Sequence, residues 1–295
     1  MRRGAQSAEE VECISIYFIL NVKTGVLGVR GCTTALCVRD SGGVLEQAKA
    51  LIGQSVQIAV LTGAGISTDS GIPDFRGPNG LWRHDDNAKK ASHISTYTRD
   101  PEVRAINWQH RADGDLWANV APNAGHRALV QLERQGKLSC LITQNVDGLH
   151  QMAGSSPEVV IEVHGTTRQV MCLDCDYRDD IEVVLDRVRA GEPDPRCGQC
   201  GGILKSATVS FGQNLDRNLL ARAQEAAASC EVFMAIGTSL EVFPINETVQ
   251  IASRFGAEVI IVNGEPTAFD SMASLVVRGE ISELLPQLVE HGSTP

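Results

Sequence analysis

Short apolar runs separated by amphipathic segments recur along this chain. The runs have five or six residues, and apolar side chains are nearly continuous in each: 56–61, 138–143, 159–163, 232–236 and 258–262. Runs of this kind are typical of parallel strands covered on both faces. A further strand is predicted over 207–211.

Helical periodicity is found between these runs. The predicted helices are 44–52, ended by Gly53, then 126–135, 181–190 and 217–229, with Asp216 as the N-cap of the last. Alternating strands and helices predict an α/β fold with a parallel sheet and right-handed crossovers.

The first run is followed by a glycine turn that suggests a dinucleotide site. Gly63 and Gly65 let the backbone approach a phosphate, but the G-x-G-x-x-G fingerprint is incomplete because position 68 is threonine. A purely structural glycine turn is the alternative. The continuation Gly71-Ile72-Pro73-Asp74-Phe75-Arg76 sets a rigid proline, a carboxylate, an aromatic ring and a guanidinium in succession, which favours a ligand site.

Polar residues also follow the later runs. In open α/β sheets ligands bind at the carboxyl ends of the strands, where these residues are expected to gather. They are Thr143-Gln144-Asn145-Val146-Asp147-Gly148-Leu149-His150, then His164-Gly165, Gly237-Thr238-Ser239 and Asn263-Gly264. A lone histidine at a strand end is often structural, but these neighbours favour a functional role for His164.

Four of the nine cysteines form two C-x-x-C pairs, Cys172 with Cys175 and Cys197 with Cys200. Two such pairs supply four thiolates to one tetrahedral zinc ion, which leaves no open position and therefore predicts a structural site. A redox-active pair is the alternative. The other five are expected to be buried small hydrophobes or incidental surface thiols: Cys13, Cys32, Cys37, Cys140 and Cys230.

Composition narrows the class of protein. The 295 residues are 43% hydrophobic and 21% charged, as in soluble globular proteins, and the net charge of −10 argues against a general nucleic-acid binder. The apolar run 14–20 is too short to span a membrane. Glu9, Glu10 and Glu12 speak against a signal or transit peptide, so a cytoplasmic protein is expected.

These motifs, in this order over about 44–288, together resemble the sirtuins, which are NAD-dependent protein-lysine deacylases. The resemblance also includes Leu240 after Gly237-Thr238-Ser239. It implies an α/β fold in which a Rossmann-like parallel-sheet domain carries a small lobe, made of a zinc ribbon and a helical insertion. NAD would bind between them as a co-substrate, with one structural Zn²⁺.

The implied domains are a weakly ordered extension over 1–42, a Rossmann-like NAD-binding domain over 43–80 with 120–168 and 205–290, a helical part of the small lobe over 81–119 and a zinc-ribbon part over 169–204. The helical part carries Trp82, Trp108 and Trp117, which are expected in its core.

The resemblance also implies residue roles. His164 would be the general base, with Asn145 and Asp147 also catalytic. The cofactor-binding residues would be Gly63, Ala64, Gly65, Asp74, Phe75, Arg76, Gln144, Asn145, Asp147, Gly237, Thr238, Ser239 and Asn263. Val209, Phe211 and Gly212 would bind an acyl-lysine protein or peptide, and Cys172, Cys175, Cys197 and Cys200 would hold zinc.

The expected reaction releases nicotinamide, O-acyl-ADP-ribose and free lysine. Mono-ADP-ribosyl transfer and a non-catalytic NAD-sensing module are the alternatives. The chain departs from the family pattern at Gln213, where glutamate is usual, and at Ser206, where proline is common. Members that remove acidic acyl groups carry a Tyr-x-x-Arg pair, which here is Trp108-Gln109-His110-Arg111, so a neutral or longer acyl group is favoured.

Overall fold

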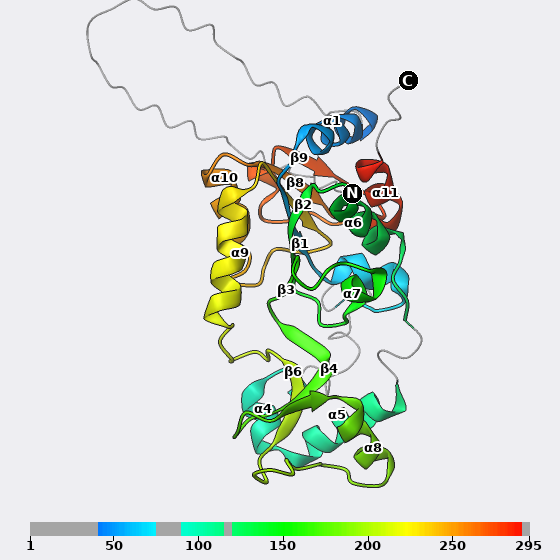
Figure 1. The fold of residues 1–295 in the computed structure, drawn as a ribbon, viewed down its shortest axis with the longest axis vertical. Helices are drawn as coiled ribbons and strands as arrows, with labels where there is room; N and C mark the ends of the chain where they lie inside the picture. The colour runs from blue at the N-terminus through cyan, green and yellow to red at the C-terminus, as the bar shows by residue number, and fades with distance from the viewer. Residues whose placement is uncertain (1–40, 75–89, 115–119, 291–295) are drawn as a thin grey trace, which may run out of the picture. The chain divides into compact units, whose positions relative to one another are not determined.

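A six-stranded parallel sheet forms the centre of the fold (Figure 1). This computed structural model describes residues 41–74, 90–114 and 120–290, which belong to one unit, Arg39–Pro295. The strand order is β3-β2-β1-β7-β8-β9. The strands are β1 Ile58–Thr62, β2 Leu138–Thr143, β3 Val160–Glu162, β7 Val232–Ile236, β8 Glu258–Val262 and β9 Leu275–Val277.

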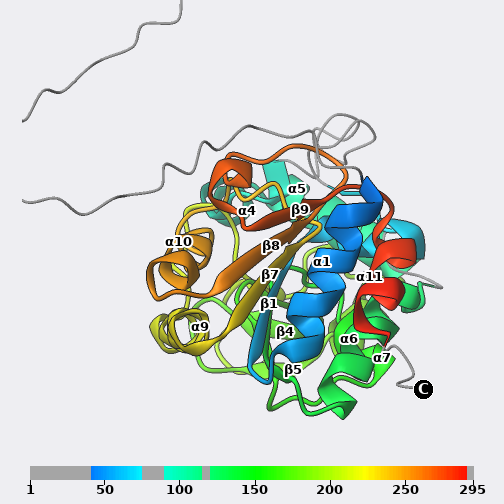
Figure 2. The same cartoon turned by 90° about the horizontal axis from the view of Figure 1, so that it is seen from above.

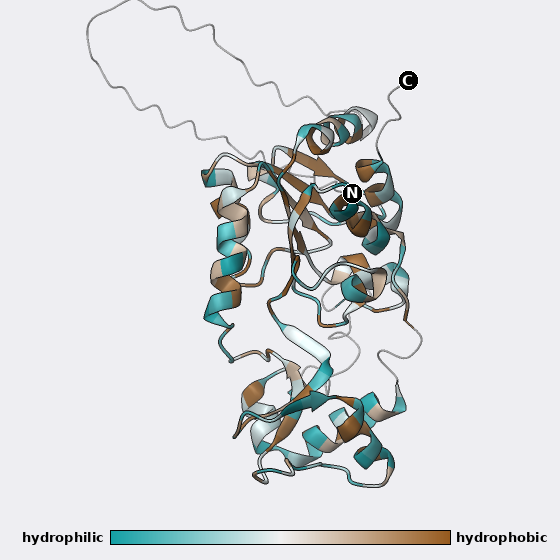
Figure 3. Ribbon diagram, viewed as in Figure 1, coloured by the Kyte–Doolittle hydropathy of each residue, from teal (hydrophilic) through white to brown (hydrophobic). Residues whose placement is uncertain are grey.

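Alternating side chains of these strands enter two separate cores. In β1, Ile58 and Val60 face one core, and Ala59 and Leu61 face the other. Both faces of the sheet are covered (Figure 2), which explains why β1 and β7 are buried along their whole length and why the strands of this sheet are mostly apolar (Figure 3). One face packs on α1 Ser41–Gln54, α6 Ala124–Arg134 and α11 Ile281–Val289, and the other on α9 Arg217–Ser229 and α10 Glu247–Arg254.

A second, antiparallel sheet has the order β5-β4-β6 (lower half of Figure 1). Its strands are β4 Gly165–Cys172, β5 Arg178–Asp180 and β6 Leu204–Thr208, and the nearby helices are α4 Ile94–Arg99, α5 Pro101–Asp113 and α8 Glu182–Arg189. Trp108 of α5, Val170 of β4 and Val184 of α8 share one core. The helical insertion and the cysteine-bearing segment are therefore packed together. Short elements complete the fold: η1 Ala64–Ser70, α7 Leu149–Ala153 and η2 Asp270–Met272.

Most predicted elements are present, with differences at their ends. β2, β7 and β8 have the predicted bounds, and Asp216 caps α9 by accepting from Asn218 and Leu219 N–H. β1 begins two residues late because Val56 is 64% exposed and its N–H bonds the Glu231 carboxylate instead. Gly53 does not end α1, which continues to Gln54.

The strand predicted over 207–211 is shifted: β6 is Leu204–Thr208. The apolar pattern misses its start because Lys205 is a buried lysine within the strand, only 3% exposed. The Lys205 ammonium donates to the carbonyls of Ser206 and Thr208. Residues 209–211 leave the sheet, and Phe211 instead pairs with His93 in an isolated bridge.

Trp108 is fully buried in the small core, as expected of the helical part, while Trp82 and Trp117 lie outside the described residues. Cys140 and Cys230 are buried thiols, as predicted, and Cys13, Cys32 and Cys37 are also outside the described residues. No helix in the described part of the chain has the length and apolar character to cross a membrane.

One buried ion pair joins the helical insertion to the ribbon. The Arg104 side chain, 3% exposed, makes two hydrogen bonds to the Asp194 carboxylate, of 2.9 Å from Nε and 2.8 Å from Nη2. Its Nη1 donates to the carbonyls of Tyr97 and Thr98. The guanidinium thus ties α4 and α5 to the segment that precedes the second cysteine pair.

We expect Asp194→Ala to lower the free energy of unfolding by about 3 kcal/mol, because it leaves a buried guanidinium without its counter-charge. Urea denaturation followed by tryptophan fluorescence measures this. Glu192→Ala is the control: it breaks the exposed pair with Arg187, which contributes less than about 1 kcal/mol. Equal losses in the two variants would contradict the prediction.

Candidate functional site

The carboxyl ends of β1 and β7 touch through glycine. A Cβ on Gly63 would lie 2.7 Å from the Gly237 oxygen, and one on Gly65 would lie 2.8 Å from the Gly237 Cα. Gly237 itself has φ +61°. Gly63 N–H bonds the Ile236 carbonyl at 3.0 Å, and Gly65 N–H bonds the Gly237 carbonyl at 2.8 Å. The two glycines of the G-x-G turn therefore have a packing role that the sequence did not reveal.

This contact lies where the strand order changes direction, between β1 and β7. In open α/β sheets that point is where a ligand crevice forms. A cleft of about 1040 Å³ opens there. It is at the upper end of the range of about 300–1,000 Å³ usual for ligand pockets, which suits a ligand of dinucleotide size.

All predicted ligand-binding and catalytic residues that are described line this one cleft. They are Gly63, Ala64, Gly65, Asp74, Gln144, Asn145, Asp147, His164, Val209, Phe211, Gly212, Gly237, Thr238, Ser239 and Asn263. The predicted residues Phe75 and Arg76 lie outside the described residues.

Residues 144–148, here called the catalytic loop, are bonded to the first glycine turn. The Asn145 amide donates to the Gly63 carbonyl and to Ser67 Oγ, both at 3.1 Å. Ser67 Oγ in turn donates to the Asp147 carboxylate at 2.8 Å, and Leu149 N–H bonds the other carboxylate oxygen. Gln144 Nε2 donates to Thr238 Oγ1 at 3.0 Å, which links the loop to β7.

Ser67 is a site residue that the sequence analysis did not assign. It is fully buried and touches both Asn145 and Asp147. It lies in the glycine turn, but a single serine carries no sequence pattern that would mark it as a site residue. Burial raises the pKa of Asp147, and the bonds from Leu149 N–H and Ser67 oppose that rise.

Two buried histidines lie behind the loop. His126 is 3.5 Å from Ser67 Oγ, and the His126 and His150 ring centres are 5.0 Å apart. Burial lowers the pKa of His126 to about 4 and that of His150 to about 3, so both are neutral at pH 7. His150 Nε2 also meets Thr62 Oγ1 at 3.0 Å. These neutral rings add no positive charge near Asp147.

His164 has a defined tautomer. Its Nδ1 is 2.9 Å from the Gln144 carbonyl oxygen, which can only accept, so Nδ1 carries the proton. Nε2 is then left with its lone pair, and burial lowers the pKa of the ring. Next to it, Gly165 at φ +76° lies so close to the Ala207 carbonyl that no side chain fits. His164 is thus held as a neutral base in the cleft.

The cleft wall that is made by the helical insertion and β6 carries two basic side chains. Arg111 and Lys205 both line the cleft, and Asn107 Oδ1 accepts from Arg111 Nε at 3.2 Å. Burial, with the nearby Arg111 charge, lowers the pKa of Lys205 to about 7. Trp108, by contrast, is buried in the small core and does not line the cleft.

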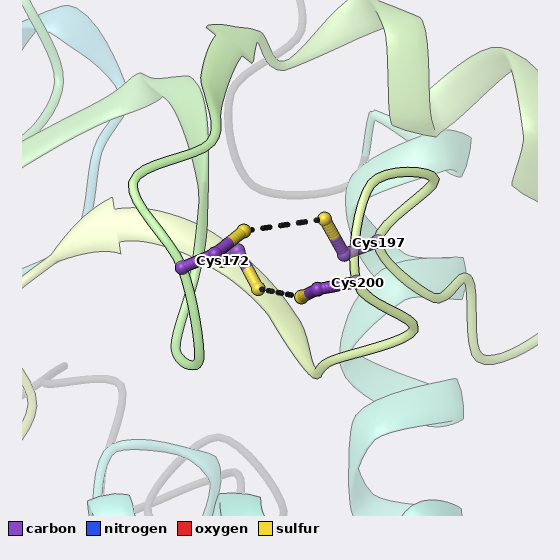
Figure 4. A group of neighbouring side chains, drawn as sticks. Cys172, Cys197 and Cys200 are labelled. Carbon is purple, nitrogen blue, oxygen red and sulfur yellow. Dashed lines mark hydrogen bonds between the residues drawn. The ribbon is translucent and has the colours of Figure 1, made fainter.

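The four predicted metal ligands converge. The sulfur atoms of Cys172, Cys175, Cys197 and Cys200 all lie within 4.8 Å of one another (Figure 4). Cys172 and Cys200 are 3.5 Å apart and Cys175 and Cys197 3.7 Å, close to the edge of about 3.8 Å of a tetrahedron with 2.3 Å Zn–S bonds. Backbone N–H groups of Asp174 and Gly202 point at two of the sulfurs. The residues fit one structural zinc ion.

Together the switch-point cleft, the neutral base and the closed four-cysteine site define an enzyme class that binds a dinucleotide and carries a structural metal. Comparison with known proteins is consistent with this class: residues 63–244 match the model of the Sir2 family. The chain belongs to the Sir2 family.

The relatives are similar over most of their length. The NAD-dependent protein deacetylase 2 of Streptomyces coelicolor is 48% identical over 79% of this chain and 96% of its own. A solved structure described as "Sir2-p53 peptide-NAD+" has a TM-score of 0.76 and 31% identity, over 85% of this chain and 99% of that chain. "The structure of Sir2Af2 bound to a myristoylated histone peptide" has a TM-score of 0.68 and 34% identity, over 84% and 95%.

We expect Cys197→Ser to abolish zinc binding and to unfold the small core, because a closed four-thiolate site tolerates no missing ligand. Elemental analysis gives the zinc content. In a background with Trp82→Phe and Trp117→Phe, the emission of Trp108, which shares that core with Cys172 and Cys197, reports its folding. Cys140→Ala, a buried thiol in another core, is the control and should keep its zinc. Full zinc content in Cys197→Ser would refute the assignment.

Proposed function

We propose that this chain is an NAD-dependent protein-lysine deacylase that releases nicotinamide, O-acyl-ADP-ribose and free lysine. The observation that carries the proposal is the neutral His164, whose Nε2 lone pair is available in the same cleft as Asn145 and Asp147. Membership of the Sir2 family and the deacetylase relatives support the same activity. A module that only senses NAD would not need a base held in one tautomer.

NAD, when bound, supplies the ribose carbon that is transferred from nicotinamide to the acyl oxygen. The chain's own residues then have distinct tasks. Gly237, Thr238, Ser239 and Asn263, at the ends of β7 and β8, would bind the adenosine half. Gly63, Ala64, Gly65 and Asp74, with Phe75 and Arg76, would bind the phosphates and the nicotinamide end. Gln144 would line the ribose pocket.

Asn145 and Asp147 would hold the nicotinamide ribose and its loop. The hydrogen bonds that they make with Ser67 and the Gly63 carbonyl fix their orientation before the ligand arrives, which limits the entropy lost on binding. His164 would take a proton from a ribose hydroxyl at Nε2. A pKa below the ordinary value for histidine keeps this nitrogen unprotonated at neutral pH.

The acyl-lysine peptide would add a strand beside Val209, Phe211 and Gly212. Phe211 already pairs with the 92–94 segment on one side, since its N–H bonds the Ser92 carbonyl and its carbonyl accepts from Ile94. The neighbouring Ser210 is bonded within the turn, since its carbonyl accepts from Gln213 N–H at 3.0 Å. Gln213 keeps this turn in place, because its side-chain oxygen accepts from Ser210 N–H at 2.8 Å.

A second candidate substrate is a lysine whose acyl group ends in a carboxylate. Arg111 and Lys205 favour it because they bring a guanidinium and an amine to the cleft wall. An anion there would offset the cost of burying the guanidinium and would favour the charged form of the lysine, whose pKa is about 7. Replacement of the expected tyrosine by the buried Trp108 disfavours it, because the indole does not reach the cleft. The neutral acyl group remains our first choice.

We also propose the division into a Rossmann-like domain, 43–80 with 120–168 and 205–290, and a small lobe, 81–119 with 169–204, after an extension at 1–42. The two sheets and their separate cores support it. A cytoplasmic location is proposed because metal-binding thiolates persist best where thiols stay reduced. The net charge of −10 supports a protein that does not bind nucleic acid directly.

We expect an acetyl-lysine peptide to lose its acetyl group only when NAD is added, with O-acetyl-ADP-ribose appearing in equal amount by mass spectrometry. His164→Ala should lower kcat by about 10²–10⁴, the usual contribution of a general base, while NAD binding by calorimetry is kept. His110→Ala, a histidine that does not line the cleft, is the control. Appearance of ADP-ribosylated protein without loss of the acetyl group would favour the transferase alternative. An unchanged kcat in His164→Ala would exclude His164 as the general base.

Arg111→Met separates the two acyl classes. We expect it to lower kcat/KM for a succinyl-lysine peptide by about tenfold or more, because it removes the cation, and to change the value for an acetyl-lysine peptide by less than about threefold. Arg99→Met, on the neighbouring α4 and outside the cleft lining, is the matched control. Equal losses on both peptides would show that Arg111 supports the wall and does not select the acyl group.

A further inference from the structure

An irregular stretch of β4 leaves its partner strand just before the metal site. Gly165 pairs with Thr208 of β6, but the next paired residues are Val170 and Ser206. Five steps along β4 therefore match only two along β6. Bulges of this kind bend a strand and redirect its side chains, and they are common beside active sites. Here the intervening residues, 166–169, include Thr167 and Arg168, which contact the catalytic loop.

Two residues of this bulge contact the catalytic loop. Both the N–H and the Oγ1 of Thr167 donate to the Val146 carbonyl, at 2.9 Å and 2.8 Å. The Arg168 side chain lies on the backbone of Gly148, where a Cβ would come within 3.0 Å of its Cδ and Cζ and closer still to Nε. Gly148 has φ +72°, which favours glycine and leaves the space that Arg168 occupies.

Arg168 also acts on the charge of the loop. Burial raises the pKa of Asp147, and the Arg168 charge opposes that rise. Opposing effects also act on the pKa of Glu162 in β3: burial and the Asp147 charge raise it, while Gln151 and the Arg168 charge lower it. The Arg168 charge therefore favours the ionised form of both carboxylates, one of which belongs to the site.

We propose that Thr167 and Arg168 are positioning residues that hold the catalytic loop, and with it the Asp147 carboxylate, in place for the ribose of NAD. This inference rests on the proposed function, in which Asp147 contacts that ribose. It assigns to the bulge of β4 the task of linking the zinc-bearing sheet to the catalytic loop. Neither residue touches the reacting atoms in this role.

Arg168→Gln should lower kcat/KM for NAD by about tenfold and leave KM for the peptide unchanged, because only the loop and its charge are altered. Thr167→Val, which keeps one of the two bonds to Val146, should cause a fall of about threefold. Arg178→Gln is the matched control: Arg178 is exposed on the same small sheet, in β5, and does not line the cleft. Zinc content and melting temperature should stay at control values in all three.

The pH profile separates positioning from simple support of the fold. The charged and titratable groups around Asp147 are Glu162, Arg168, His126, His150 and His164. Loss of the Arg168 charge should move the acid limb of kcat/KM for NAD to higher pH, whereas Arg168→Lys should restore it and Thr167→Val should not move it.

The positioning role would be overturned if Arg168→Gln had the same kinetics and pH profile as Arg178→Gln. It would also be overturned if the fall in kcat/KM for NAD followed a loss of zinc or of thermal stability. Suppose that the unmodified protein is active, that His164→Ala is inactive and that Arg168→Gln has normal activity. In that case the proposed function stands and only this inference fails. Absence of NAD-dependent deacylation in the unmodified protein would overturn the proposed function together with it.

Discussion

The backbone contact between the glycine turn after β1 and Gly237 after β7 is the constraint on which the site depends. It needs the absence of a Cβ at Gly63, Gly65 and Gly237, since each would collide with backbone atoms of the other turn. The catalytic loop then bonds to both sides of this contact, through Asn145 to the Gly63 carbonyl and through Gln144 to Thr238. His164 follows, because its Nδ1 is bound to the Gln144 carbonyl. If the turns at Gly63 and Gly237 moved, these hydrogen bonds would therefore move the His164 imidazole with them.

The predictable parts of the fold are those whose signal is local and repeated. Each strand of the large sheet except β9 carries a buried apolar run, so β2, β7 and β8 could be placed to the residue. β9 is an apolar triplet between Ser274 and Arg278, whereas the equally short β3 lies within the longer run 159–163. In β6 the run is interrupted by the buried Lys205. The site residues could be predicted because the four cysteines have a fixed spacing and the polar motifs directly follow predicted strands. Ser67 contacts residues that are 78 and 80 positions away, and Arg168 contacts Gly148, 20 positions away. No short-range sequence pattern indicates contacts of this kind.

The small core depends on segments that could not fold separately. Trp108 comes from the helical insertion, Cys172 and Cys197 from the two knuckles, and Val184 from the helix between them. Each contributes too few apolar side chains to form a core of its own, which is why a metal and a buried ion pair accompany them. The Arg104–Asp194 pair joins the same segments on the polar side. A metal held by the four cysteines would therefore also support the packing of Trp108 from the helical insertion.

The position of His164 at the junction of the two sheets has a mechanical consequence. Its carbonyl accepts from Val209 N–H at 2.7 Å, so the outgoing chain at Gly165 and the returning chain after β6 are fastened together beside the imidazole. If the sheet of β4, β5 and β6 rotates when a ligand enters, the two segments joined by this hydrogen bond lie where the axis of rotation would pass. Points on an axis move least, so the His164 imidazole would keep its place while the walls around it close.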